Sequence, residues 1–243
     1  GNMFKNSYDY QRNLDSHMMK NTEWGSVAYL QHSKYGSQAS VRINNNSSYI
    51  TGYAATVEPT LGYAGGTSTA GNRVESTSLG KDGTYTVNYL NTNSTVASTT
   101  NNYSGIYDMS GGVWEYVMGY TTGATTVGGS SGITSLYPNF FSNSAYSKYW
   151  DRYTSTVNTN YNNRILGDAT GEMGPFGSEK DSDNNTRYKS SWYKDHAWFA
   201  NYSGNLLLRG GGWHDGTSTG VFAFNGNSGG TNTNISFRIV LAP

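Results

Sequence analysis

The chain has 243 residues, no cysteine, and equal numbers of Lys plus Arg and of Asp plus Glu, 16 each. This length is typical of one large domain or two small ones. Without cysteine there are no disulfides, Cys-ligated metals or thiol nucleophiles. The zero net charge and the lack of a basic cluster argue against nucleic-acid binding, and no apolar run is long enough for membrane insertion. Because aromatic residues make up 14% of the chain, we expect a folded, loop-rich domain.

The N-terminal region predicts an arm followed by a helix. Residues 1–14 are polar and indicate a lead-in strand or arm. From Asp15 the pattern DSHMMKNTEWGSVAYLQHSKYG favours a helix, with Asp15 or Ser16 as its N-cap and Gly36 as its stop. The internal Gly25 weakens this helix or divides it into two short ones.

The middle of the chain predicts strands, turns and one short helix. Residues 37–102 indicate short strands and long turns, with a loop at 64–71, and residues 121–190 form a long insertion. Within the insertion, Ser142–Thr154 predicts a short helix capped by Asn143 or Ser144. Further on, Ser191–Gly204 contains five aromatic residues. Any of these that stay exposed beside the C-terminal surface are natural binding anchors.

The stretch GIYDMSGGVWEYVMGY predicts a glycine-rich turn followed by an aromatic strand that begins at Val113. Asp108 and Glu115 flank this turn, whose backbone carbonyls are free, and Ca²⁺ prefers this mixture of carboxylate and carbonyl oxygens. In the alternative interpretation, Asp108 only caps the turn and Glu115 pairs with an arginine inside the fold. The residues leave both interpretations open.

The C-terminal segment combines apolar ends with a polar middle. Leu206–Arg209, Val221–Phe224 and Phe237–Ala242 predict strands. The small polar residues between them cannot form a core, because polar groups buried without partners cost free energy. They must therefore face water or a ligand, which makes this segment a candidate binding face.

Several side chains of this segment have predicted directions. A large indole is mostly buried, so Trp213 is expected to fill the core beneath the face. Arg209 and Arg238 are expected to tie internal carboxylates or carbonyls. Because side chains alternate along a strand, we predict that Phe222 and Phe224 face the ligand while Val221 and Ala223 face the interior.

Three motifs in order, EWGSVAYL, YDMSGGVWEY and LRGGGW … SFRIVL, resemble the formylglycine-generating-enzyme (sulfatase-modifying-factor) family, a variant of the C-type lectin fold. Gly112, Tyr116, Gly212 and Ser236 replace the residues usual in that family. The resemblance covers about a third of the chain. It implies an α+β fold, loop-rich with short antiparallel strands and few helices, in a single domain over 1–243.

The resemblance also limits the chemistry. The catalytic members use a pair of cysteines, so formylglycine generation is excluded here. Relatives with an iron site need a histidine cluster, which His17, His32, His196 and His214 do not form in the sequence. The family's calcium site is carried over to Asp108, the carbonyls of Gly111 and Val113, and Glu115. A structural Ca²⁺ is the one cofactor that the resemblance implies.

The C-terminus is similar to a non-catalytic branch of the fold, the variable proteins of diversity-generating retroelements, whose last segment displays varied side chains. This similarity implies a non-enzymatic receptor or adhesin domain with 206–243 as the variable segment. It further implies a protein or cell-surface ligand and a location outside the cell, on the cell surface or on a phage virion, and it leaves the oligomeric state open. The expected ligand-binding residues are Gly212, His214, Asp215, Thr217, Ser218, Thr219, Phe222, Phe224, Gly226, Ser228 and Gly230.

Two other classes of function stay open. The chain could be a structural subunit of a pilus or phage tail, in which the same surface makes subunit contacts. It could also be a cysteine-independent enzyme, since Asp151, Asp168, Glu172 and His196 are capable of acid–base chemistry. No spacing brings a nucleophile, a base and an orienting group together, and His17 and His32 share no helix face. We therefore expect no catalytic residues.

Overall fold

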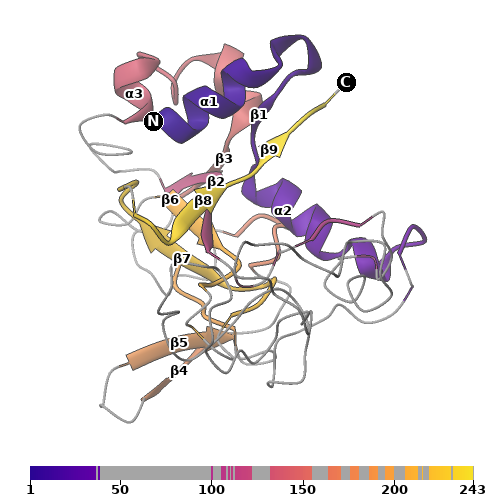
Figure 1. Cartoon of the computed structure of the whole chain (residues 1–243). Coiled ribbons are helices and arrows are strands. Elements are labelled where there is room, and N and C mark those ends of the chain that lie inside the picture. The colour runs from indigo at the N-terminus through magenta and orange to yellow at the C-terminus, as the bar shows by residue number, and fades with distance from the viewer. Residues whose placement is uncertain are drawn as a thin grey trace, which may run out of the picture.

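The computed structural model shows a mixed α/β protein whose sheets are mostly antiparallel and whose described residues include few helices (Figure 1). It describes residues 1–36, 38, 100, 105–107, 109, 111, 113–121, 132–154, 164–170, 176–180, 186–190, 195–199, 206–212, 215, 219–230 and 232–242. The α-helices are α1 (Asn2–Tyr10), α2 (Asn21–Ala28) and α3 (Ile133–Leu136). The strands are β1 (His17–Met18), β2 (Trp114–Thr121), β3 (Asp151–Tyr153), β4 (Phe176–Lys180), β5 (Thr186–Ser190), β6 (Leu206–Arg209), β7 (Phe224–Asn227), β8 (Ile235–Phe237) and β9 (Ile239–Val240).

Strand β2 is the centre of the main sheet, and all eight of its residues are buried. Its partner along one edge is β6, which runs antiparallel and pairs in turn with β7. Along the other edge, two parallel strands share its length, β8 beside Trp114–Tyr116 and β3 beside Gly119–Thr121. The C-terminal segment thus lies on both sides of the central strand.

The two faces of the main sheet pack against different layers. One face of β2 presents Trp114, Tyr116, Met118 and Tyr120 to a core that includes Phe4 of α1 and Ile133 of α3. The opposite face packs against α2 through Trp24 and Ala28. This alternation follows from the two-residue period of a strand, and each large side chain buried in this way contributes roughly 1.5–3 kcal/mol.

The N-terminal region differs from the sequence prediction. Residues 1–14 form α1 and a 3₁₀ helix, Arg12–Leu14, instead of an arm or strand. Asp15 is no N-cap, because it adopts a left-handed conformation (φ 49°) and leads into β1. The N-cap of α2 is Lys20, whose backbone N–H donates to Glu23 Oε2 (2.8 Å). The prediction missed α1 because its apolar stripe is narrow and is buried only against distant residues.

Gly25 does not break α2. It lies where residues 167 and 168 cross the helix, and a Cβ built at Gly25 would lie 1.9 Å from the carbonyl oxygen of Gly167. The glycine therefore allows a close approach between backbones, at a helix-propensity cost of about 1 kcal/mol relative to alanine.

The predicted strand at Leu206–Arg209 is confirmed, and the helix predicted over Ser142–Thr154 is confirmed only in its first part, because Asp151–Tyr153 is strand β3. Leu206–Arg209 is strand β6. A 3₁₀ helix spans Ser144–Tyr149, and its N-cap Asn143 accepts a hydrogen bond from the Ala145 N–H (2.9 Å). The predicted strand at 221–224 begins later, because Val221 and Phe222 form a turn before β7. The expected strands within 37–102 and the loop at 64–71 lie outside the described residues.

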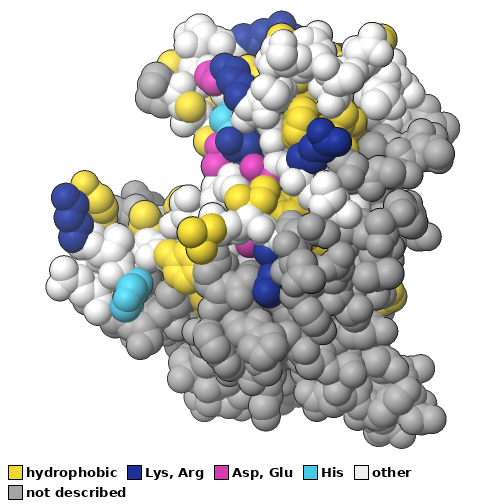
Figure 2. Space-filling view, turned by 180° about the vertical axis from the view of Figure 1, so that it is seen from behind, with side chains coloured by type: hydrophobic (Ala, Val, Ile, Leu, Met, Phe, Trp, Pro, Cys, Tyr) yellow, Lys and Arg dark blue, Asp and Glu magenta, His cyan; other side chains and the backbone are white. Residues whose placement is uncertain are grey.

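Strands β1 and β9 pair antiparallel and join the N-terminal and C-terminal regions, with His17 opposite Val240. No helix among the described residues is both long enough and apolar enough to span a bilayer. On the face shown in Figure 2, the Lys and Arg side chains of the described residues lie apart from one another and form no continuous patch.

Candidate functional site

After β6, the chain enters the candidate binding loop through two glycines whose backbone conformation requires this residue type. Gly210 and Gly211 have φ angles of 87° and 80°, which L-residues with side chains rarely adopt. A Cβ at Gly211 would lie 2.8 Å from the Cα of Thr219. The two ends of the following loop are therefore in direct contact, and Gly220 N donates to the carbonyl oxygen of Gly210 (3.2 Å).

Hydrogen bonds close the base of this loop. The Thr219 hydroxyl donates to the Gly212 carbonyl oxygen (2.9 Å), and Thr219 is completely buried. Asp215 also binds the backbone of Gly212. Its Oδ2 accepts from Gly212 N (2.7 Å), and its own N–H donates to Gly212 O (3.0 Å). Residues 213–218 thus run between two anchored ends. Of these, 213, 214 and 216–218, which include Trp213, His214, Thr217 and Ser218, lie outside the described residues.

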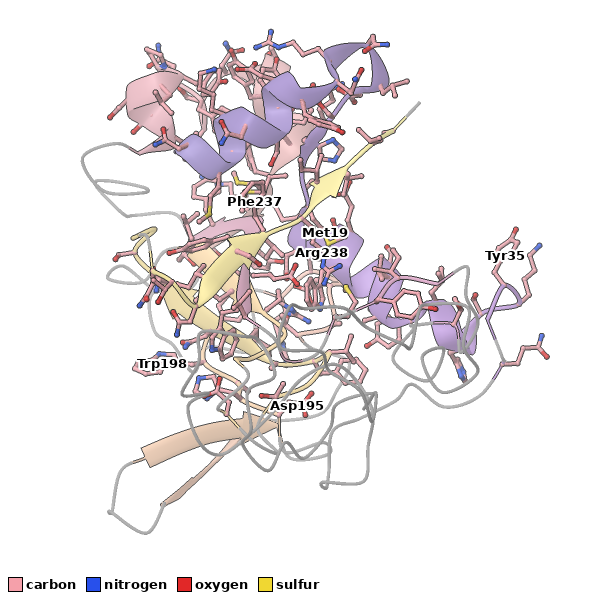
Figure 3. All side chains as sticks on the ribbon, viewed as in Figure 1. Met19, Tyr35, Asp195, Trp198, Phe237 and Arg238 are labelled. Carbon is pink, nitrogen blue, oxygen red and sulfur yellow. The ribbon has the colours of Figure 1, made fainter. Side chains whose placement is uncertain are left out.

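A buried carboxyl group supports the second anchored end. Asp195 is fully buried, and its Oδ2 accepts from the Phe222 N–H (3.2 Å). Burial raises the pKa of Asp195 well above its usual range. A Cβ at Gly220 would lie 2.1 Å from this same oxygen, so the chain passes directly over the carboxyl group. Figure 3 shows Asp195 beneath the sheet.

Arg209 ties the underside of the segment to the rest of the core, as the sequence predicted. It is fully buried, and its Nη2 donates to the carbonyl oxygens of Ala169 (3.1 Å) and Val221 (3.4 Å). Its guanidinium lies over the rings of Trp24 and Phe224. Burial lowers the pKa of Arg209 to about 10, so the group is still charged at neutral pH.

The expectation that Phe222 and Phe224 face a ligand is wrong. Their exposed fractions are 1% and 0%, and both belong to the core cluster that includes Trp24 and Leu207. Val221 and Ala223 are also buried, as predicted. All four are enclosed because the turn at 221–222 breaks the strand alternation on which the prediction relied. Gly212 and Thr219, which were also predicted to contact the ligand, are buried and form part of the loop base.

Exposed positions lie on the turn after β7. Ser228 and Gly230 are exposed, as are Asn232 and Thr233. Gly226 is half-buried opposite Leu207. The turn is attached to the sheet by Tyr116, whose hydroxyl hydrogen-bonds to Asn227 Oδ1 and lies 2.9 Å from the Gly230 carbonyl oxygen. Burial raises the pKa of Tyr116 to about 12, so this hydroxyl keeps its proton at neutral pH.

One exposed aromatic residue lies beside this surface. Trp198 is 38% exposed, and its backbone N–H donates to the Phe224 carbonyl oxygen (3.0 Å) at the edge of β7. Figure 3 shows its ring directed outward from the sheet. The sequence predicts binding anchors among the aromatic residues of 191–204 but does not single out Trp198. The exposure of this residue depends on the pairing of Ala197 with Phe224, which no local pattern indicates.

The candidate calcium ligands are only partly described. Glu115 is buried in β2, and Arg238 approaches both of its carboxylate oxygens, with Nη2 2.6 Å from Oε1 and Nε 2.6 Å from Oε2. This is the internal pairing with an arginine that the sequence left open as an alternative. Gly111 has a φ of 81° in the turn before β2, Val113 is half-buried, and Asp108 lies outside the described residues. Within the described part of the chain, no three His, Asp or Glu side chains are grouped so that they could hold a metal ion.

The residues considered for acid–base chemistry have structural partners where they are described. Asp151 accepts from the Thr22 N–H (2.7 Å), and Asp168 accepts from Tyr153 and Thr170. The His196 ring lies edge-on to the Trp114 ring, with 5.7 Å between the ring centroids. Glu172 lies outside the described residues. The side chains of His17, in β1, and His32, in the 3₁₀ helix Leu30–His32, belong to different elements.

No protein-family model matches this chain, and no curated protein is significantly similar to it in sequence.

Proposed function

We propose that the chain is a non-enzymatic ligand-binding domain on a C-type lectin scaffold that displays a diversified surface at 212–230. Its ligand is a protein or another component of a cell surface, and the domain itself is displayed outside the cell or on a phage virion. The observation that carries this proposal is the closed base of the loop, where Thr219 and Asp215 both hydrogen-bond to Gly212.

This base supports a binding role for a physical reason. A loop that must accept many different side chains needs fixed ends, so that changes between them do not disturb the core. Here the fixed ends use two glycines, one buried hydroxyl and one buried carboxyl group, Asp195. Substitutions between the ends then leave the hydrogen bonds of Thr219 to Gly212 and of Phe222 to Asp195 in place. Ser, Gly, Asn and Tyr dominate the chain, which is also the usage of antibody-type binding surfaces.

We narrow the set of positions proposed for ligand contact. His214, Thr217 and Ser218 lie between the fixed ends, and Ser228 and Gly230 are exposed on the turn after β7. Asp215 contributes to the loop base, so we expect it to vary less. Thr219, Phe222 and Phe224 belong to the scaffold.

The first test is to sequence this locus across many cells or virions of one population. We expect substitutions at 214, 217, 218, 228 and 230, derived from adenines, with Gly211, Thr219, Gly220, Phe222 and Phe224 unchanged. An invariant segment would remove the claim of diversification.

A second test does not need the natural ligand. Positions 214, 217, 218 and 228 are randomised in a displayed library, which is then selected against an unrelated folded protein such as egg-white lysozyme. A control library randomises Lys5, Asn6 and Asp9, which are exposed on α1 and lie outside the proposed contact positions. We expect folded binders from the first library and few from the second. Loss of folding in most members of the first library would contradict the proposal.

A further inference from the structure

A small apolar pocket lies where the start of α1 meets the turn after β7. The residues that line it include Met3, Met18, Met118, Ile133 and Leu206, together with Tyr116 and Gly230. The segments that form it are far apart in the sequence. Figure 1 shows the N-terminal end of α1 on the same side of the sheet as the end of β7. The pocket belongs to the core cluster on the α1 side of the sheet.

The size of the pocket selects the kind of group that fits. Its volume is about 60 Å³. A single water needs roughly 10–15 Å³ on this measure, whereas an engineered cavity that takes benzene has about 150 Å³. The pocket is therefore larger than a water site and smaller than an aromatic site. A branched aliphatic group of three or four carbons is the best match.

The chemistry of the wall supports the same choice. Three of the lining residues, Met3, Met18 and Met118, are methionines, whose flexible side chains adapt to the shape of an apolar guest. The Tyr116 hydroxyl hydrogen-bonds to Asn227 and Gly230, so its polar atom already has partners within the protein. A small aliphatic guest that is buried here removes apolar surface from water and therefore gains measurable affinity.

Gly230 lines the pocket and is itself exposed. A Cβ built at Gly230 meets no atom within 4 Å, so a side chain fits there without strain. The rim around it is held by Tyr116 and by the Gly229 N–H, which donates to Asn227 Oδ1 (3.0 Å). Glycine leaves the entrance open, and a long apolar side chain at this position would fold over it.

We propose that this pocket binds a small aliphatic side chain of a protein partner, of the size of valine, and that the residue at position 230 determines whether the pocket is open. The partner's identity as a protein rests on the proposed function. The existence and selectivity of the pocket do not.

Methionine methyl NMR provides the test. The protein is labelled with ¹³C at its methionine methyls and titrated with isobutanol, which resembles a valine side chain, and with the larger benzyl alcohol. We expect saturable shifts at Met3, Met18 and Met118 with isobutanol. Met19 and Met109 are internal controls, because they lie in the core cluster on the opposite face of the sheet. Equal shifts at all described methionines, or none at the first three, would overturn the proposal. So would tighter binding of benzyl alcohol.

Two variants test the control by residue 230. Gly230→Leu is expected to weaken the apparent affinity for isobutanol at least tenfold without lowering Tm. Ser228→Leu adds the same side chain at an exposed position that does not line the pocket, and it should leave the affinity unchanged. An equal effect of both variants, or no effect of Gly230→Leu, would overturn the role of residue 230. If isobutanol does not bind while the locus is diversified in the population, only the pocket inference fails.

Discussion

Arg238 and Glu115 form an ion pair in which each carboxylate oxygen lies 2.6 Å from a guanidinium nitrogen. Glu115 belongs to the central strand β2 and its side chain is 8% exposed, whereas Arg238 lies between β8 and β9 and is 24% exposed. The pair therefore links the centre of the main sheet to the end of the chain.

Removing one partner of this pair is expected to destabilise the protein. Arg238→Gln leaves a buried carboxylate with weaker compensation, and breaking a buried pair in this way costs roughly 3 kcal/mol or more. The measurement is the free energy of unfolding in urea. Lys148→Gln is the control, because it removes an exposed pair with Asp15 and should change stability little. Equal effects of the two variants would contradict the structural role of Arg238.

The ion pair between Arg238 and Glu115 is also expected to make the thermal stability of the protein independent of calcium. Both oxygens of Glu115 already contact a cation, so we expect that neither EDTA nor millimolar CaCl₂ shifts Tm appreciably. The check is a thermal melt in each buffer, repeated with Glu115→Gln. A rise in Tm with CaCl₂ that Glu115→Gln abolishes would instead assign Glu115 as a calcium ligand.

His17 is expected to make stability depend on pH. Its Nδ1 lies 2.6 Å from the Asp15 carbonyl oxygen and its Nε2 lies 3.0 Å from Glu23 Oε1, so both ring nitrogens face acceptors. Burial lowers the pKa of His17, but the hydrogen bonds to Glu23 and Asp15 outweigh it, and the net shift is upward. Lys20 and Lys148 carry the nearby positive charges, and Tyr149 packs on the ring.

The direction of this dependence follows from the raised pKa. The folded state binds the proton more tightly than the unfolded state, where the pKa is about 6.5. The stabilisation is therefore complete below about pH 6.5 and is lost as the pH rises through the higher folded pKa. We expect the difference in Tm between the wild type and His17→Gln to shrink as the pH is raised from about 6.5 into the alkaline range. His32→Gln is the control, and a constant difference across this range would disprove the role of His17.

Gly25 and Gly230 form a matched pair for alanine substitution. Gly25→Ala adds about 1 kcal/mol of helix propensity but places a methyl group 1.9 Å from the Gly167 carbonyl oxygen. The clash is with backbone, so we expect a net loss of roughly 3 kcal/mol or more. Gly230→Ala meets open space and should stay within about 0.5 kcal/mol of the wild type. Chemical denaturation of both variants decides the prediction, and equal stabilities would show that residues 167 and 168 do not pack on α2.

The local features of this fold could be predicted because their causes are local. The apolar run of β6, the capping side chain of Asn143 and the glycine-rich entry to β2 each act within a few residues of themselves. The helix at 2–10 escaped prediction because its buried side chains, Phe4 and Ser7, are few and the rest of its surface is polar.

The sequence predicted which segment holds the candidate site, but it did not predict which side chains of that segment are exposed. Composition and the polar middle of 206–243 are the grounds on which we predict a binding face in this segment. Which side chains are exposed on it was decided by long-range contacts, since Asp195 holds the backbone of Phe222 and Tyr116 holds the turn at Asn227. These contacts turned Phe222 inward and left Ser228 and Gly230 outside.

By itself, the sequence determined that this protein lacks cysteine chemistry and carries no net charge, and that its C-terminal segment alternates apolar strands with polar stretches. These are properties of composition and of neighbouring residues. The tertiary structure alone decided that Arg238 meets Glu115, that Gly25 lies against Gly167, and that an apolar pocket opens beside Gly230. Each of these joins segments that are distant in sequence, and such pairings depend on the packing of the whole chain rather than on any local pattern.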